Sequence, residues 1–121
     1  WPERIQEADF VVVNCALTAS SHHLLNAEAF AAMKPGVRVV NVGRGPVIDE
    51  QALIAALASG KVHSAALDVF EQEPLPADSP LRTHPFCIFG SHNASNTVDG
   101  VKRTSHKAIQ LLAGFLQGAT A

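Results

Sequence analysis

Four short apolar runs alternate along the chain with segments of helical periodicity. The runs are DFVVVNC (residues 9–15), VRVVNV (37–42), HSAALDVF (63–70) and CIFGS (87–91). Each is apolar at nearly every position rather than at every second one, which is typical of a strand covered on both faces of a parallel sheet. We therefore expect four strands, one in each run.

Two of the helical segments carry start signals. Asn26 can accept a hydrogen bond from the first turn of a helix over NAEAFAAM (26–33), and Asp49 can do the same for EQALIAALAS (50–59). In the second segment the apolar side chains fall on one face, and Gly60 supplies a left-handed exit. Both segments are predicted to be helices between strands.

A third helix is predicted from about residue 97 nearly to the end, because apolar residues recur there at helical spacing: Val101, Ile109, Leu112, Phe115 and Leu116. Residues 3–8 resemble the end of a further helix. Alternating β and α elements predict an α/β fold, a parallel sheet with helices on both faces and right-handed crossovers. No repeat or linker divides the 121 residues, so we expect one domain.

Composition narrows the classes of function. Hydrophobic residues make up 47% of the chain and charged residues 17%, which is typical of a globular protein. Nine Lys and Arg against eleven Asp and Glu, with no basic run, argue against nucleic-acid binding. Neither a bilayer-spanning run nor a signal peptide is present, so we expect no membrane contact and a cytoplasmic location. Cys15 and Cys87 are expected to be buried, reduced thiols.

Polar side chains follow the carboxyl end of every predicted strand. In an open parallel sheet, ligands bind beyond these ends because the loops there line the crevice. The residues that this rule selects are Asn14 to Thr18, Gly43-Arg44-Gly45, Asp68 with Glu71 and Glu73, and Ser91-His92-Asn93. One cation, several carboxylates and one histidine are thus predicted to converge on a single rim.

Arg44 and His92 are the candidate reactive groups. The planar guanidinium of Arg44 suits a carboxylate or phosphate, but an arginine tied to a loop carboxylate such as Asp49 fits the position equally well. His92 suits proton transfer because an unperturbed imidazole titrates at about 6.5. A solvated loop histidine is the alternative. The other five histidines are expected to be structural or on the surface.

Three carboxylates compete for a role beside His92. Asp68, Glu71 or Glu73 could fix its tautomer through a hydrogen bond to one ring nitrogen, and spacing alone does not choose among them. Metal binding is not expected, because the chain has no HExxH motif and no paired Cys or His spacing.

Three ordered motifs carry a resemblance to a known family. VVNVGRGPVIDEQAL (39–53), SAALDVFEQEPL (64–75) and a histidine after the next strand resemble the D-isomer-specific 2-hydroxyacid dehydrogenases, which include phosphoglycerate, glycerate and D-lactate dehydrogenases. The segment ADFVVVNCALT (8–18) extends the match to nearly the whole chain. The resemblance implies a Rossmann-like doubly wound parallel sheet, of which this chain would be the C-terminal half only.

The resemblance implies roles for individual residues. Arg44 matches the arginine that holds the substrate carboxylate, Glu73 matches the glutamate paired with the histidine, and His92 matches the catalytic acid and base. Asp68 resembles the aspartate that holds the nicotinamide carboxamide. The residues that would line the cofactor, NAD or NADP, are Asn14, Cys15, Ala16, Thr18, Val42, Gly43, Asp68 and His92.

The implied activity is that of an oxidoreductase acting on the CH-OH group of a small D-2-hydroxy acid, in a reversible reduction of the 2-keto acid. Arg44 and His92 would stabilise the developing alkoxide, and Glu73 would favour the charged imidazole. Formate dehydrogenases resemble this pattern but carry Gln in place of Glu73, because formate gives up hydride without a proton to manage. Glu73 therefore favours hydroxy-acid chemistry.

The chain departs from the family pattern in several places. Gly90-Ser91 stand where the family has Thr-Pro before the histidine, so the loop that presents His92 is expected to follow a variant geometry. The family often has Pro at the place of Ala16. The family's GxGxxG motif, which cradles the pyrophosphate, and its acidic ribose ligand are not found in these 121 residues.

The missing motif predicts an incomplete enzyme. We expect residues 1–121 to be a partial NAD(P)-binding domain, without a substrate domain and with negligible dehydrogenase activity alone. The first strand would then lie at an open edge, which favours a homo-oligomer, most simply a dimer. A different class of function also stays open, a non-catalytic interaction module like the corepressors that resemble these dehydrogenases.

Overall fold

The apolar runs form one parallel sheet. In the computed structural model, which describes residues 3–118, the strands are β1 (Phe10–Val13), β2 (Val37–Asn41), β3 (Val62–Leu67) and β4 (Cys87–Phe89). They lie in the order β1-β2-β3-β4, and each pairs in parallel with its neighbour. The four predicted strands and their parallel arrangement are confirmed.

The helices begin where their capping residues predict. They are α1 (Ala27–Ala32), α2 (Glu50–Ala58) and α3 (Val98–Gly118), with 3-10 turns at η1 (Ile5–Glu7), η2 (Gly45–Val47) and η3 (Pro80–Thr83). Asn26 accepts a hydrogen bond from the N–H of Ala29 at 3.0 Å. Asp49 accepts one from the N–H of Ala52 at 3.0 Å, and Gly60 follows α2 with φ of 74°. Both N-caps satisfy backbone donors that the first helical turn leaves free.

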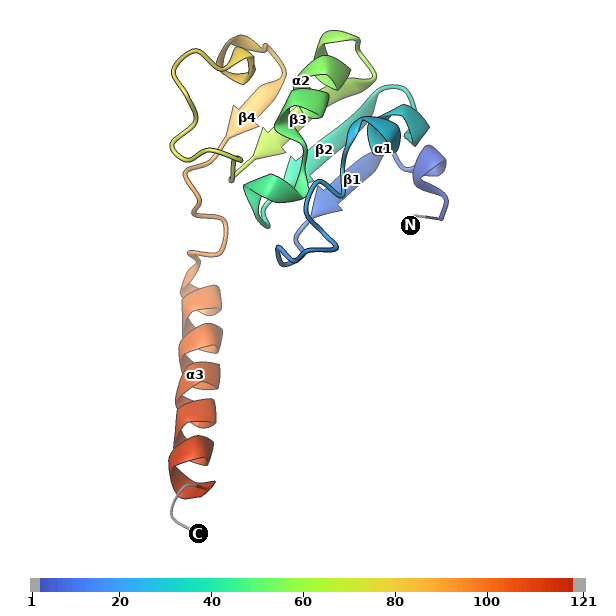
Figure 1. Cartoon of the computed structure of the whole chain (residues 1–121). Coiled ribbons are helices and arrows are strands. Elements are labelled where there is room, and N and C mark those ends of the chain that lie inside the picture. The colour runs from blue at the N-terminus through green and yellow to red at the C-terminus, as the bar shows by residue number, and fades with distance from the viewer. Residues whose placement is uncertain (1–2, 119–121) are drawn as a thin grey trace.

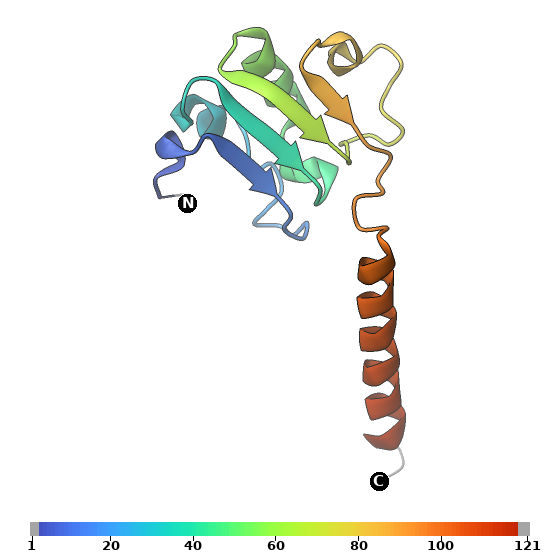
Figure 2. The same cartoon turned by 180° about the vertical axis from the view of Figure 1, so that it is seen from behind.

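Both connecting helices cover the same face of the sheet. Figure 1 shows α1 and α2 in front of the strands, and Figure 2 shows the bare face from behind. The strand order follows the chain order, so right-handed crossovers place every connecting helix on one side. The α/β class is confirmed, but the expected second layer of helices is not found within residues 3–118.

The core lies between the sheet and these two helices. Val39 of β2, Val62 of β3 and Leu53 of α2 are almost completely buried there. Removing such a side chain from water contributes about 1.5–3 kcal/mol. On the opposite face Phe10 is 60% and Ile88 72% exposed. The prediction that these strands are covered on both faces is therefore wrong for the described residues, because no crossover lies on the second face.

β1 lies at an edge of the sheet, as expected from the sequence. Among residues 3–118 its ladder partner is β2 alone, which leaves one row of its backbone groups unpaired with any strand. The guanidinium of Arg38 lies 5.4 Å from the centroid of the Phe10 ring and partly covers that apolar surface.

α3 extends away from the sheet, as both views show (Figures 1 and 2). Its position in the sequence confirms the predicted third helix, but none of its residues is buried. Ile109, Leu112 and Phe115 are all largely exposed on it. Within the described part of the chain, no helix is both long and apolar enough to cross a bilayer.

Candidate active site

The loop after β2 is held by the buried side chain of Asn41. Its Oδ1 accepts a hydrogen bond from the N–H of Gly43 at 3.0 Å, and its Nδ2 donates one to the carbonyl of Arg44 at 3.1 Å. A Cβ at Gly43 would lie 2.9 Å from the carbonyl oxygen of Cys15, so glycine lets the loops after β1 and β2 approach closely. We call residues 43–45 the arginine loop. It presents the exposed side chain of Arg44 at the rim of the sheet.

Gly45 brings the arginine loop against the loop after β3. A Cβ at Gly45 would lie 1.8 Å from the carbonyl oxygen of Phe70, a distance that no side chain can occupy. The second glycine is therefore required for the packing of two loops. This contact places Arg44 beside the segment that carries Glu73.

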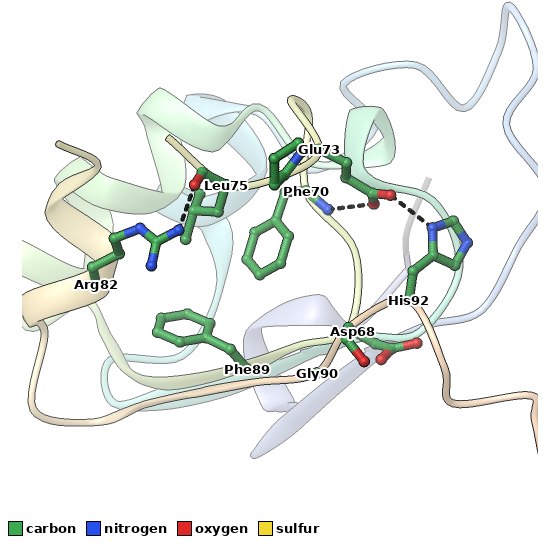
Figure 3. A pocket seen from close by; sticks show the side chains of 10 residues that line it. Asp68, Phe70, Glu73, Leu75, Arg82, Phe89, Gly90 and His92 are labelled. Atoms are coloured by element: carbon green, nitrogen blue, oxygen red, sulfur yellow. Dashed lines mark hydrogen bonds and ion pairs between the residues drawn. The ribbon is translucent and has the colours of Figure 1, made fainter. Parts of the chain in front are cut away.

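Glu73 and His92 are hydrogen-bonded to one another. His92 Nδ1 lies 2.7 Å from Glu73 Oε2, and the N–H of Phe70 donates to Glu73 Oε1 at 3.0 Å (Figure 3). The bond with His92 and then the bond from Phe70 lower the pKa of the Glu73 carboxyl, and the charge of Arg44 lowers it further. Glu73 is therefore ionised at neutral pH, close to both groups.

His92 has a left-handed backbone. Its φ is 59°, a conformation that costs a residue with a Cβ roughly 1–2 kcal/mol. The backbone N–H of His92 donates to the carbonyl of Asp68 at 2.7 Å, which holds this conformation together with the bond to Glu73. Strained backbone conformations are concentrated at functional sites. Here the left-handed conformation of His92 directs its imidazole toward the Glu73 carboxylate.

Asp68 holds the loop that presents His92. Its Oδ1 accepts the N–H of Asn93 at 3.0 Å and its Oδ2 the N–H of Ala94 at 2.7 Å. These bonds, of which the one from Asn93 is the largest cause, lower the pKa of the Asp68 carboxyl. A Cβ at Gly90 would lie 2.1 Å from Asp68 Oδ1. Glycine at position 90 thus makes room for the carboxylate that anchors this loop.

A pocket of about 330 Å³ opens beside the Glu73–His92 pair. Figure 3 shows this pair at one end and Arg82 at the other, with the rings of Phe70 and Phe89 between them. Arg82 donates to two backbone carbonyls of the loop after β3 and so closes the far end. No pattern in the sequence singled out Arg82, which lies in a proline-rich loop.

A sequence model of a known family matches this chain. The model describes the NAD binding domain of D-isomer specific 2-hydroxyacid dehydrogenases, and it matches residues 1–94. The chain belongs to this family. The resemblance carried by residues 39–53 and 64–75 is confirmed. The expected dinucleotide cofactor is also confirmed, because the matching model describes an NAD binding domain.

Relatives of this D-2-hydroxyacid dehydrogenase domain are close in sequence. Glyoxylate/hydroxypyruvate reductase B of Escherichia fergusonii is 48% identical over 114 residues, which cover 94% of this chain and 35% of that protein. The Citrobacter koseri protein of the same name is 49% identical over the same shares. The chain therefore spans about a third of the length of these curated relatives.

Solved structures share the fold. A D-isomer specific 2-hydroxyacid dehydrogenase of Xanthobacter autotrophicus Py2, in complex with NADPH and MES, superposes with a TM-score of 0.72 at 46% identity, over 73% of this chain and 28% of that one. D-Lactate dehydrogenase of Aquifex aeolicus, complexed with NAD and lactic acid, has a TM-score of 0.76 at 28% identity, over 94% and 39%. The Rossmann-like class is confirmed.

The residues expected to line the cofactor lie on the same rim. Those in the loops after β1 and β2 are exposed apart from Gly43: Asn14, Cys15, Ala16, Thr18 and Val42. Ser21, which sequence reasoning missed, shapes the first of these loops. Its Oγ accepts the N–H of Thr18 at 2.7 Å and donates to the carbonyl of Ala16 at 2.8 Å.

The structure decides two questions that the sequence left open, namely which carboxylate bonds His92 and whether Arg44 is tied to Asp49. Glu73 bonds His92, whereas Glu71 pairs with His23 in a different loop. Asp49 caps α2, and within residues 3–118 no ion pair joins it to Arg44. The guanidinium of Arg44 donates only to the neighbouring backbone carbonyl of the arginine loop among these residues.

Two further expectations concern the cysteines and metal ions. Cys15 and Cys87 are both free thiols, but Cys15 is exposed because its loop turns outward beyond the end of β1. The prediction of burial is therefore wrong for Cys15, and Cys87 is only partly buried. In the described part of the chain no three His, Cys, Asp or Glu side chains are grouped so as to hold a metal ion.

Proposed function

We propose that this chain carries the catalytic residues of an NAD(P)-dependent D-2-hydroxyacid dehydrogenase, which interconverts a small 2-keto acid and the D-2-hydroxy acid. The observation that carries the proposal is the 2.7 Å hydrogen bond between Glu73 and His92, beside the exposed cation Arg44. Membership of the family supports the same chemistry.

The rim fits a nicotinamide dinucleotide. Leu17 and Val42, beyond the ends of β1 and β2, are exposed and offer apolar surface to a planar ring. Each carboxylate oxygen of Asp68 accepts one backbone N–H, which leaves a lone pair for a carboxamide. When bound, NAD or NADP supplies or accepts a hydride.

Arg44 is the proposed partner of the substrate carboxylate. Its guanidinium can donate two parallel hydrogen bonds to a carboxylate, and its charge stabilises an oxygen that becomes negative during reduction. Asn41 and Gly45 hold the arginine loop before any ligand binds. The cation is thus presented with little reorganisation of the backbone.

His92 is the proposed acid and base. The ionised Glu73 accepts a hydrogen bond from Nδ1 and keeps that nitrogen protonated. This leaves Nε2 to give a proton to the keto oxygen during reduction and to take it back from the hydroxyl during oxidation. Because the pKa of Glu73 lies below its ordinary value, this arrangement holds across the neutral range.

The rest of the substrate pocket is proposed to come from outside these residues. The chain spans 35% of the length of the reductases that it resembles, and the side chains of Arg44 and His92 are open to solvent. An open site leaves water around the reacting groups. We therefore expect residues 1–121 alone to reduce 2-keto acids at a negligible rate.

Self-association and location are part of the same proposal. The exposed edge of β1, with Phe10 beside it, favours a homodimer of this chain. Light scattering over a range of concentrations tests this, and a monomer throughout contradicts it.

The cytoplasm is the proposed location, because the free thiols of Cys15 and Cys87 suit a reducing compartment.

A segment exchange tests the proposed activity. This chain replaces the matching segment of the Escherichia fergusonii reductase, and reduction of glyoxylate and hydroxypyruvate is followed by the oxidation of NADH or NADPH. We expect the hybrid to reduce both acids. Glu73→Gln and His92→Gln should each lower kcat by about 100-fold or more. Gln72→Ala, an exposed neighbour in the same loop, is the matched control and should retain activity.

A hybrid that is folded and binds the dinucleotide but reduces no 2-keto acid would contradict the proposal. Circular dichroism and cofactor fluorescence establish folding and binding independently of turnover. That outcome would favour the alternative class of function, a non-catalytic interaction module on the same scaffold.

A further inference from the structure

Glu71 lies two residues before Glu73 but has different hydrogen-bond partners. Its Oε1 is paired with His23 Nε2, and its Oε2 accepts the N–H of Glu50 at 3.3 Å. The N–H of Glu71 in turn donates to Glu50 Oε2 at 3.3 Å. Glu71 and Glu50 therefore exchange two hydrogen bonds that join the loop after β3 to the first turn of α2.

His23 connects these two segments to a third. Its backbone N–H donates to the carbonyl of Pro46 at 2.8 Å, and the N–H of Leu25 donates to the carbonyl of Val47 at 3.1 Å. These bonds fix the end of the loop after β1 against the turn that follows the arginine loop. The side chain of Glu71 thus joins the loop after β1 to the first turn of α2, and the backbone of His23 links both to the turn after β2.

Two carboxylates meet at this point, those of Glu50 and Glu71. The carboxylate of Glu50 is partly buried, and burial together with the negative charge of Glu71 raises its pKa. Within residues 3–118 the one ion pair that Glu71 makes is with His23. The hydrogen bond with His23 holds the Glu71 carboxylate in place beside Glu50.

We propose that Glu71, held by His23 and Glu50, is the positioning residue that places Glu73 against His92. Phe70 precedes Glu71 directly, and its N–H donates to Glu73 Oε1 at 3.0 Å. Anchoring Glu71 fixes the direction of this N–H, and the N–H fixes the carboxylate that His92 contacts. The inference rests on the proposed function only in its description of Glu73 and His92 as catalytic groups.

Two substitutions test whether Glu71 positions Glu73, with little disturbance elsewhere in the fold. Glu71→Ala removes both side-chain bonds. His23→Gly removes the imidazole at a residue with φ of 49°, where glycine is free of the strain that alanine would carry. Gln72→Ala is the matched control, because its exposed side chain lies between the two glutamates in the sequence.

The test is made by NMR on this chain and requires no turnover. In Glu71→Ala, we expect the Phe70 amide to exchange with solvent about tenfold faster, as expected for loss of a net hydrogen bond. The pKa of the Glu73 carboxyl, followed through its carbon shift, should rise toward its ordinary value. His23→Gly should change both in the same direction by less, and Gln72→Ala should change neither.

Two results would overturn the inference. One is a Glu71→Ala variant in which the Phe70 amide and the Glu73 pKa stay as in the parent chain. The other is faster exchange of equal size at Phe70 and at Leu53 in the buried face of α2, which would mean a general loss of stability. Since neither readout involves a substrate, failure of the hybrid enzyme to turn over would leave this result intact.

Discussion

The helix α2 within residues 3–96 and the helix α3 were both predicted from helical periodicity, yet only residues 3–96 contain a core. In α2, Leu53 is 1% exposed, whereas in α3, at an equally apolar position of its helix, Leu112 is 59% exposed. Both helices form, and the hydrogen bonds of each join residues only four positions apart in the sequence. What covers an apolar face is decided by the rest of the fold. Periodicity therefore predicts a helix but not its neighbours.

The same substitution should have opposite effects in the two regions. Gly45→Ala places a Cβ 1.8 Å from the Phe70 carbonyl oxygen, so we expect a loss of at least about 4 kcal/mol in the free energy of unfolding. Gly114→Ala in α3 meets nothing within 4 Å and should favour the helix by about 1 kcal/mol. Urea unfolding and circular dichroism at 222 nm measure these changes. Equal stabilities of both variants would contradict the loop contact.

Truncation of leucine sharpens the comparison. Leu53→Ala leaves a cavity between α2 and the sheet and should cost about 2–5 kcal/mol in urea unfolding. Leu112→Ala should change the unfolding free energy by less than about 0.5 kcal/mol in a monomer. A large loss for Leu112→Ala that grows with protein concentration would show that α3 is covered by a second copy.

A histidine in each region should rank two replacements in opposite order. His92 has a left-handed backbone, so His92→Asn should be more stable than His92→Ala by about 1 kcal/mol. His106 is exposed within α3, where alanine is a better helix former than asparagine. His106→Ala should therefore be more helical than His106→Asn. Thermal unfolding measures the first pair and circular dichroism the second. The same order at both sites would argue against a strained His92.

The smallest expected effect is the acid sensitivity of Glu73. Its folded pKa is lowered, so its contribution to stability is present above the unfolded pKa and is lost as the pH falls through the folded value. Because the side chain is 37% exposed, solvent screening limits this contribution to less than about 1 kcal/mol. Glu73→Gln should remove it, which unfolding at neutral pH and below pH 4 (about the ordinary glutamate value) can detect. An unchanged pH dependence would contradict the pairing.

Features that depend on neighbouring residues in the sequence were predictable. Asn26 and Asp49 cap helices because the donors that they satisfy lie three residues away, and the strands follow from continuous apolar runs. The family motifs added the pairing of Glu73 with His92, which spacing alone left open. That choice depends on where β4 places residue 92, and no local pattern contains this information.

Features that depend on packing between loops were missed. Asn41 and Ser21 are buried polar residues that hold the loops of the rim, and an Asn inside an apolar strand was the available signal for the first. The open face of the sheet was missed because it depends on the strand order, which decides on which face the connecting helices lie. The roles of Glu71 and His23 were missed because they lie 48 residues apart in the sequence.

The most direct measurement of the central claim is kcat for 2-keto acid reduction by the hybrid reductase with and without His92→Gln. If Glu73 and His92 form the proton-transfer pair, the parent hybrid turns over and the variant loses about 100-fold or more in kcat, while its affinity for the dinucleotide changes little. A His92→Gln hybrid whose kcat stays within about twofold of the parent would contradict the account.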